Sequence, residues 1–261
     1  MNISTTIRIV LTVAIGAALA AITFTSSAEP PSKGANHGAS QQSSEKKQDK
    51  QDEKDERKAQ QRLSKQQQQE RIRQQQESLR LYRENIALRQ AIAKRNAQLL
   101  QEQKRLAHYR FQQTYYERLR QQQAQLPDER YDYDNDPYYY TAPNYRYRRD
   151  GSYYETNQYG ADILRQALNN GYQEGVLAGR ADKQDNWRFD YKQSFAYEDA
   201  NYGYDGRYVR QDDYNHYFRE GFQRGYEDGY YNRQQYGSSA TGSDSLMDTV
   251  LRSILNLEAL Q

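Results

Sequence analysis

The sequence predicts a mainly α-helical protein: a long, polar, coiled-coil-like N-terminal helix, then a small helical module rich in tyrosine and glycine, with disordered linkers between them. Two observations predict this class. Residues 45–125 contain neither proline nor glycine and consist mostly of Gln, Lys, Arg and Glu, which are strong helix formers. A glycine-containing block also occurs twice, fifty residues apart. The mean hydropathy of −1.24 argues against a large single core.

Residues 1–28 have the pattern of a secretory signal peptide. Arg8 precedes an apolar run at 9–21, and the small residues Ser26, Ser27 and Ala28 follow it. We therefore expect export to the periplasm, cell surface or medium, with cleavage near Ala28. A retained anchor is the alternative. Residues 29–44 read as a disordered linker. The absence of cysteine excludes disulfides and thiolate chemistry.

Apolar residues within 45–125 recur at seven-residue steps, as in a helix that packs along one stripe. The main stripe comprises Ile72, Leu79, Ile86, Ala93, Leu100 and Ala107. A second, less regular stripe comprises Leu81, Leu88, Ile92, Leu99 and Leu106. We expect one long helix that self-associates as a coiled coil between 71 and 120 and ends before Pro127. A solvated single helix is the alternative, because Gln, Asn and Arg fill many stripe positions.

The net charge of +2 conceals two opposed regions. Residues 45–125 carry a net charge of +9, and residues 126–261 carry −8. The basic region is suited to an anionic surface, and the acidic region is suited to repelling such a surface or docking on its neighbour. The alternative is that both regions are solvated faces.

Residues 126–160 form a stretch rich in tyrosine and aspartate, which we interpret as an extended loop. Within it, residues 145–154 alternate around Asp150-Gly151, a pair that favours a hairpin turn. Residues 237–261 are predicted to be a linker followed by an amphipathic helix, which starts at Ser243 or Asp244 and runs through Leu260.

The repeated glycines define the module at 161–236. They are Gly171, Gly175, Gly179, Gly221, Gly225 and Gly229. Each triplet lies on one helical face, since residues four apart are neighbours on a helix. Three glycines cost a helix roughly 2.5–3 kcal/mol, and close approach of two backbones is the natural compensation. We predict helix-packing roles in two helices, 162–182 and 212–233, each capped by aspartate, that form a closed pseudo-twofold pair. A binding groove is the alternative.

A third helix is expected between the glycine helices, with Trp187, Tyr191 and Phe195 on its buried face. The run YYETNQYG at 153–160, followed by the two glycine blocks, resembles exported bacterial proteins of unassigned function that share a Tyr/Gly-rich C-terminal region. The resemblance covers about 128–236. It implies an exported location and nothing about activity.

No motif of nucleophilic, metal or phosphate chemistry is recognisable, so we expect no enzyme and no cofactor. The three histidines are dispersed; we expect His108 to be solvated on the long helix and His216 to lie at the surface. The favoured class is a non-catalytic structural or interaction protein of the bacterial cell envelope.

The alternative class is a module for glycan or peptidoglycan. Its candidate stacking residues are Trp187, Tyr191, Tyr202 and Tyr204. The expected partners are a cell-wall glycan, an envelope protein or a second copy through the coiled coil. No nucleic acid is expected, and membrane contact is expected to be transient or peripheral.

Overall fold

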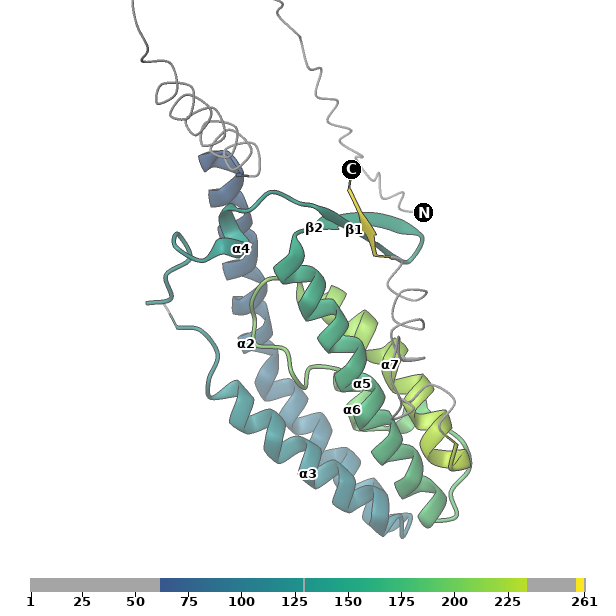
Figure 1. Cartoon of the computed structure of the whole chain (residues 1–261). Helices are drawn as coiled ribbons and strands as arrows, with labels where there is room; N and C mark the ends of the chain where they lie inside the picture. The colour runs from purple at the N-terminus through teal and green to yellow at the C-terminus, as the bar shows by residue number, and fades with distance from the viewer. Residues whose placement is uncertain (1–61, 129, 234–256, 261) are drawn as a thin grey trace, which may run out of the picture. The chain divides into compact units, whose positions relative to one another are not determined.

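The computed structural model describes residues 62–128, 130–233 and 257–260, which are mainly helical, as the sequence predicts (Figure 1). The signal peptide at 1–28, the linker at 29–44 and most of 237–261 lie outside the described residues. The elements are α2 (Lys65–Glu102), α3 (Leu106–Gln123), α4 (Pro137–Tyr140), β1 (Tyr145–Arg149), β2 (Ser152–Thr156), α5 (Gln158–Gln184), the 3₁₀ helix η1 (Tyr191–Gln193), α6 (Phe195–Asp199), α7 (Gln211–Tyr231) and β3 (Glu258–Ala259).

The glycines lie where α5 meets α7. A Cβ added to Gly171 would lie 1.9 Å from the carbonyl oxygen of Phe218, and one added to Gly221 would lie 2.0 Å from that of Leu168. The two contacts are equivalent in the repeat: Gly221 is the counterpart of Gly171, and Phe218 of α7 is the counterpart of Leu168 of α5. The two helices therefore meet through the same backbone surface on both sides, in a pseudo-twofold arrangement.

The remaining glycines continue the contact in both directions. Gly175 and Gly179 of α5 face the carbonyl oxygens of Phe222 and Tyr226, and Gly225 and Gly229 of α7 face those of Tyr172 and Val176. The contacts advance toward the C-terminus in both helices, so α5 and α7 run parallel. This separation suits Cα–H···O contacts, which help to offset the helix-weakening effect of glycine.

The prediction of one long helix across 45–125 is wrong in the described residues. The chain reverses at 103–105, and α3 returns antiparallel along α2 (Figure 1), with Gln112 Nε2 donating to the carbonyl of Ala93 at 2.7 Å. Lys104 is left-handed, with φ of 58°, and the Arg105 amide donates to the carbonyl of Leu100 at 2.8 Å. This is a Schellman ending without its usual glycine. No glycine or proline therefore marks the turn in the sequence.

The main seven-residue stripe packs inside the protein. Leu79, Ala93, Leu100 and Ala107 are buried, and α2 contacts α3, α4, α6 and α7. The antiparallel pair of α2 and α3, here called the helical hairpin, is therefore part of the fold, and the predicted long helix standing apart from the glycine module is wrong. The second stripe faces outward, with exposed fractions of 44% at Leu81 and 59% at Leu88. Whether it pairs with a second copy stays a prediction.

The β-hairpin prediction is confirmed, so the extended loop predicted for 126–160 is wrong there. β1 and β2 pair antiparallel around Asp150 and Gly151, whose φ values are 49° and 81°. Asp136 caps α4 by accepting the Tyr138 amide. β3 joins the other edge of β1. The terminal helix predicted to run through Leu260 is therefore wrong at its end, while 234–256 lie outside the described residues.

The glycine helices start differently from the prediction. Asn157, rather than an aspartate, caps α5, because its side-chain oxygen accepts the Gly160 amide. α7 follows Arg210 without a side-chain cap, and Asp212 lies within the first turn. The helix expected around Trp187 is also wrong: this crossover contains only η1 and the short α6 within irregular chain.

Tyrosine explains how a polar sequence builds a core around irregular chain. The hydroxyl groups of Tyr204, Tyr214, Tyr217 and Tyr230 donate to the backbone carbonyls of Val209, Tyr202, Arg148 and Trp187, respectively. Each ring supplies apolar area, and each hydroxyl satisfies a backbone carbonyl: three of these carbonyls lie in the irregular crossover between α5 and α7, and that of Arg148 lies in β1.

Among the described residues, every helix is too short or too polar to span a bilayer.

Adding a methyl group at the helix contact tests its closeness. We expect Gly175→Ala to destabilise the protein by about 2 kcal/mol or more, although alanine ordinarily stabilises a helix by about 1 kcal/mol over glycine. Gly225→Ala should have a similar effect, because its Cβ would meet the carbonyl oxygen of Tyr172 at 2.0 Å. Urea unfolding followed by circular dichroism measures both. Gln173→Ala, at an exposed α5 position, is the control; stabilisation by both glycine variants would contradict the close contact.

The turn between α2 and α3 can be tested by introducing a glycine instead of removing one. Lys104→Gly should raise the free energy of unfolding by about 0.5–1 kcal/mol, because it removes the cost of a left-handed non-glycine residue. Gln101→Gly, inside α2, should lower it by about 1 kcal/mol. If both substitutions destabilise the protein equally in thermal unfolding, α2 continues through residue 104.

Candidate functional site

The six glycines predicted to pack helices line the interface of α5 and α7, where an added methyl group would overlap the opposite backbone. The opposite backbone already fills the space beside these glycines, so the alternative prediction of a ligand groove at these positions is wrong. The candidate stacking residues are dispersed instead of forming one platform.

Tyr204 is wrong as a stacking residue, because its side chain is fully buried. Its ring lies 5.5 Å from that of Tyr82 and 5.2 Å from that of Tyr214. Tyr202 is half-buried, and the Arg118 guanidinium lies 4.6 Å from its ring centre. Both residues therefore serve the packing of the α6–α7 connection, Tyr202 against α3 and Tyr204 against α2 and α7.

Trp187 and Tyr191 are also engaged within the protein. The Arg105 guanidinium lies 4.5 Å from the Trp187 ring centre. Tyr191 contacts the rings of Tyr197 and Tyr226 at 5.0 and 6.2 Å. Both side chains are half-buried, so neither offers a flat exposed face.

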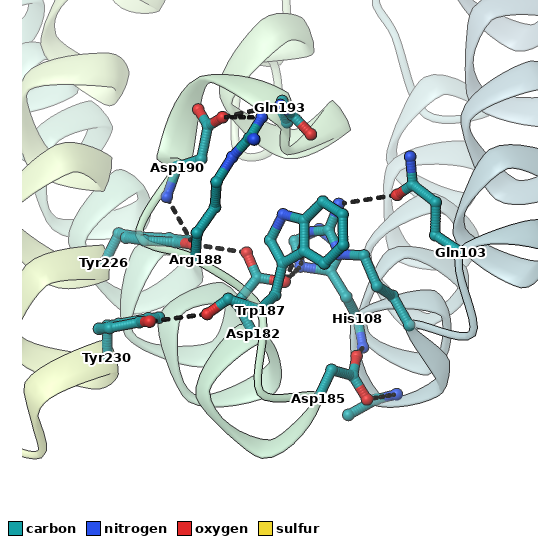
Figure 2. A network of polar contacts seen from close by, with 12 residues as sticks. Gln103, His108, Asp182, Asp185, Trp187, Arg188, Asp190, Gln193, Tyr226 and Tyr230 are labelled. Carbon is teal, nitrogen blue, oxygen red and sulfur yellow. Dashed lines mark hydrogen bonds and ion pairs between the residues drawn. The ribbon is translucent and has the colours of Figure 1, made fainter.

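A buried polar network joins the helical hairpin to the glycine helices (Figure 2). Asp182 of α5 lies at its centre: Arg105 Nη2 is 2.5 Å and His108 Nδ1 is 2.7 Å from its Oδ1, and the Tyr226 hydroxyl donates to Oδ2. Asp185 accepts the backbone amides of Ala107 and His108 at 2.9 and 2.8 Å, and so caps α3. The expectation that His108 is solvated is wrong, since it is fully buried.

The charges in this network set the pKa of Asp182. Burial by itself would raise it, but hydrogen bonds and charge from His108, with further hydrogen bonds from Arg105 and Tyr226, outweigh burial and lower the pKa below its usual value. The carboxylate is thus held ionised. A histidine–aspartate pair recurs in hydrolases, but His108 is closed to solvent, so no substrate reaches it. The network holds helices together.

Two further buried carboxylates connect the same halves of the chain. Asp199 of α6 accepts Arg89 of α2 at 3.2 Å and the Tyr115 hydroxyl at 2.9 Å. Glu174 of α5 accepts Arg118 of α3 at 2.8 Å. The basic and acidic regions are therefore complementary surfaces within one fold, which agrees with docking of the acidic region on its neighbour and not with two purely solvated faces.

A hollow of about 670 Å³, here named the tyrosine cleft, lies between the start of α2, the β-hairpin and the start of α7. The sequence did not suggest it, because its walls come from separate segments. Its aromatic lining is Tyr138, Tyr147, Tyr154 and Tyr208, and its polar lining includes Gln66, Gln67, Glu70, Arg71, Gln74, Glu155, Thr156, Arg210 and Asp213.

Tyr208 is the strained residue of the tyrosine cleft. Its φ of 69° is left-handed, which is unusual for a bulky side chain. The Tyr138 ring lies 4.9 Å away on one side, and the guanidinium of Arg207 lies 5.4 Å from the ring centre. Backbone strain of this kind concentrates at functional sites, so Tyr208 singles out the cleft.

The charged groups of the tyrosine cleft differ in how firmly they are held. Arg71 donates to the carbonyls of Tyr138 and Thr141 at 2.7 and 2.9 Å. Asp213 is buried and paired with Arg149; burial raises its pKa, opposed by the charges of Arg149 and Arg210. Arg210 is 56% exposed and lies 3.6 Å from Asp212 and 3.9 Å from Asp213, beyond hydrogen-bond distance. Burial raises the pKa of Tyr138 to about 12, so its phenol stays neutral.

Within 62–128, 130–233 and 257–260, no group of three or more His, Asp or Glu residues is placed to hold a metal ion. His216 is partly exposed, and its Nδ1 lies 3.8 Å from a carboxylate oxygen of Asp150. The described histidines therefore lie in unrelated surroundings.

No family model matches the chain, and comparisons with curated proteins and with solved structures give no significant match. The resemblance to exported bacterial proteins with a Tyr/Gly-rich region therefore stays a prediction.

Replacing Asp182 tests the buried network and its pH dependence. Asp182→Asn should cost about 3–5 kcal/mol at neutral pH, because it leaves Arg105 buried without its counter-charge and removes the carboxylate that contacts His108. The folded-state pKa of Asp182 is lowered, so its stabilisation is complete above the ordinary aspartate value of about 3.9 and is lost as the pH falls through the folded value. The difference between wild type and variant should therefore shrink below about pH 4.

Urea unfolding at pH 7 and pH 3 gives this difference directly. Asp162→Asn is the control, because Asp162 pairs with Arg165 at the surface with 57% of its side chain exposed. A similar small loss for both variants at pH 7 would show that the network contributes little.

Proposed function

We propose that this protein is an exported, non-catalytic interaction protein of the bacterial cell envelope, and that the tyrosine cleft is its contact with a partner. The expected signal peptide at 1–28 supports the location. The observation that carries the interaction is the cleft itself, with its four tyrosines and a strained aromatic residue in its wall. Clefts of this size whose walls combine aromatic and polar side chains are a usual form of binding sites.

The placement of the charged groups supports a binding role over catalysis. Glu174, Asp182 and Asp199 are paired with residues of the helical hairpin and hold the fold together. In the cleft, Asp213 is fixed by Arg149 of the β-hairpin. These carboxylates therefore serve the structure, and the tyrosines, the amides and Arg210 are left for recognition.

A glycan is the second candidate partner. It is favoured over an apolar ligand because amide, carboxylate and guanidinium groups surround the aromatic rings of the cleft. The four stacking residues expected from the sequence do not support it, since they are packed within the fold. Tyr154 and Tyr208 line the cleft with half-buried side chains, but Tyr147 and Arg149 contact the ring of the first, and Tyr138 and Arg207 contact the ring of the second. The polar groups of the cleft, and not free ring faces, therefore support a glycan.

Retention on purified bacterial envelopes tests the proposed function. The double variant Tyr154→Ala/Arg210→Ala should lose retention by about tenfold at physiological salt, since a few central residues carry most of a contact. Tyr153→Ala/Arg165→Ala is the matched control: Tyr153 is 54% exposed on the same strand, and neither residue lines the cleft. Equal retention of wild type and both double variants, lost alike on adding salt, would contradict the proposal and indicate electrostatic adhesion.

A further inference from the structure

The tyrosine cleft continues into a second hollow along α2. This second hollow has a volume of about 430 Å³ and lies between α2 and the start of α7. Gln74 and Arg210 line both hollows, so the two adjoin at this pair. The α2 side chains that line them, at positions 66, 67, 70, 71, 73, 74, 77, 78 and 81, lie along one broad face of the helix.

The length of this surface points to a chain-like ligand. From Gln66 to Leu81, the helix rises about 22 Å at 1.5 Å per residue. One small molecule fills one hollow, whereas a linear polymer can occupy both and pass the guanidinium of Arg210. The weak ion pairs of Arg210, at 3.6 and 3.9 Å, leave its donors able to turn toward such a ligand.

The charges of the surface select the class of polymer. Five carboxylates line the two hollows, Glu70, Glu77, Glu155, Asp212 and Asp213, against three guanidinium groups, Arg71, Arg73 and Arg210. Arg80 pairs with Glu77 and Arg149 pairs with Asp213 from outside the lining, so the charges nearly balance and give a polyanion no net attraction. Hydroxyl groups, in contrast, can donate to carboxylates and accept from arginine and glutamine.

The aromatic end of the surface adds a second feature of sugar recognition. Tyr154 and Tyr208 present half-buried rings at the cleft, and the amide side chains of Gln67 and Gln74 are exposed on α2. Tyr147 and Arg149 flank the first ring, and Tyr138 and Arg207 flank the second, so the two rings supply apolar contact at the wall of the cleft and not free stacking faces. The surrounding polar groups would fix the orientation of a sugar.

We propose that the tyrosine cleft and the second hollow together form one elongated site for an uncharged linear glycan, with Arg210 and Gln74 at its middle. This inference rests on the proposed envelope function and adds the ligand class and the direction of the bound chain, along α2. Tyr154 and Tyr208 contact the glycan at one end, and Ser78 and Glu77 contact it at the other.

Calorimetric titration of the full chain with β-1,4-linked N-acetylglucosamine oligomers tests the elongated site. The six-unit oligomer should bind at least about tenfold more tightly than the two-unit oligomer, because only the longer chain reaches both hollows. A six-unit oligogalacturonate, which is anionic, should bind no more tightly than the neutral hexamer, because the charges of the surface nearly balance. Equal affinity for the two neutral oligomers, or tighter binding of the anionic one, overturns the proposal.

Variants locate the binding. Arg210→Ala and Gln74→Ala should each weaken hexamer binding about three- to tenfold and leave dimer binding less affected. Gln74 is an exposed helical residue whose side chain bonds only Glu70 among the described residues, so its loss leaves the fold intact even if the arginine variant is unstable. Tyr153→Ala should leave hexamer affinity within about twofold. Unchanged affinity in Gln74→Ala and Tyr154→Ala overturns the site.

Digestion of the envelopes separates this inference from the proposed function. Retention that survives protease and disappears after glycan hydrolysis supports a glycan partner. Retention that disappears after protease alone overturns the glycan and leaves an envelope interaction with a protein. Absence of retention on any envelope overturns the proposed function itself, whereas retention without binding of any oligomer overturns only the glycan inference.

Discussion

The fold depends on the contact of glycine Cα atoms with carbonyl oxygens between α5 and α7. Six glycines let two parallel helices approach until an added Cβ would lie 1.9–2.2 Å from the opposite oxygen. At this distance, the large side chains of both helices are excluded from the interface and turn outward. On α7, the rings of Phe218, Phe222 and Tyr226 follow one another at 6.3 Å, and the α6 region packs on them.

Charge complementarity then places the helical hairpin on this pair. Each of the three buried carboxylates that face α2 and α3 belongs to the acidic region, and each meets an arginine of the basic region. A buried carboxylate without its partner is costly, so these ion pairs specify one arrangement of the helical hairpin on the two glycine helices α5 and α7. The same arrangement brings the start of α2 beside the β-hairpin and α7, and this placement creates the tyrosine cleft.

The sequence predicted what short-range patterns determine. Glycine spacing indicated close helices, Asp150-Gly151 indicated the hairpin, and composition indicated a mainly helical chain. It did not predict the turn at Lys104, because the bonds that support this turn come from Asp182 and Asp185, about eighty residues away. The prediction of the stacking residues failed for a related reason. A tyrosine such as Tyr204 is a common binding residue, but here its hydroxyl donates to the carbonyl of Val209, which lies within the fold. The cleft residues could be found only after α2, the hairpin and α7 were assembled.

Proton–proton contacts in solution test the glycine interface most directly. With glycine and tyrosine labelled for nuclear magnetic resonance, the Hα protons of Gly175 should show Overhauser contacts to the Tyr226 amide proton, since a Cβ at Gly175 would lie 2.7 Å from that nitrogen. The Hα protons of Gly225 should show a contact to the Hα of Tyr172, since a Cβ at Gly225 would lie 2.9 Å from the Tyr172 Cα. Both contacts at similar intensity would support the close parallel pair. Their absence, in a protein whose α5 and α7 are helical, would contradict it.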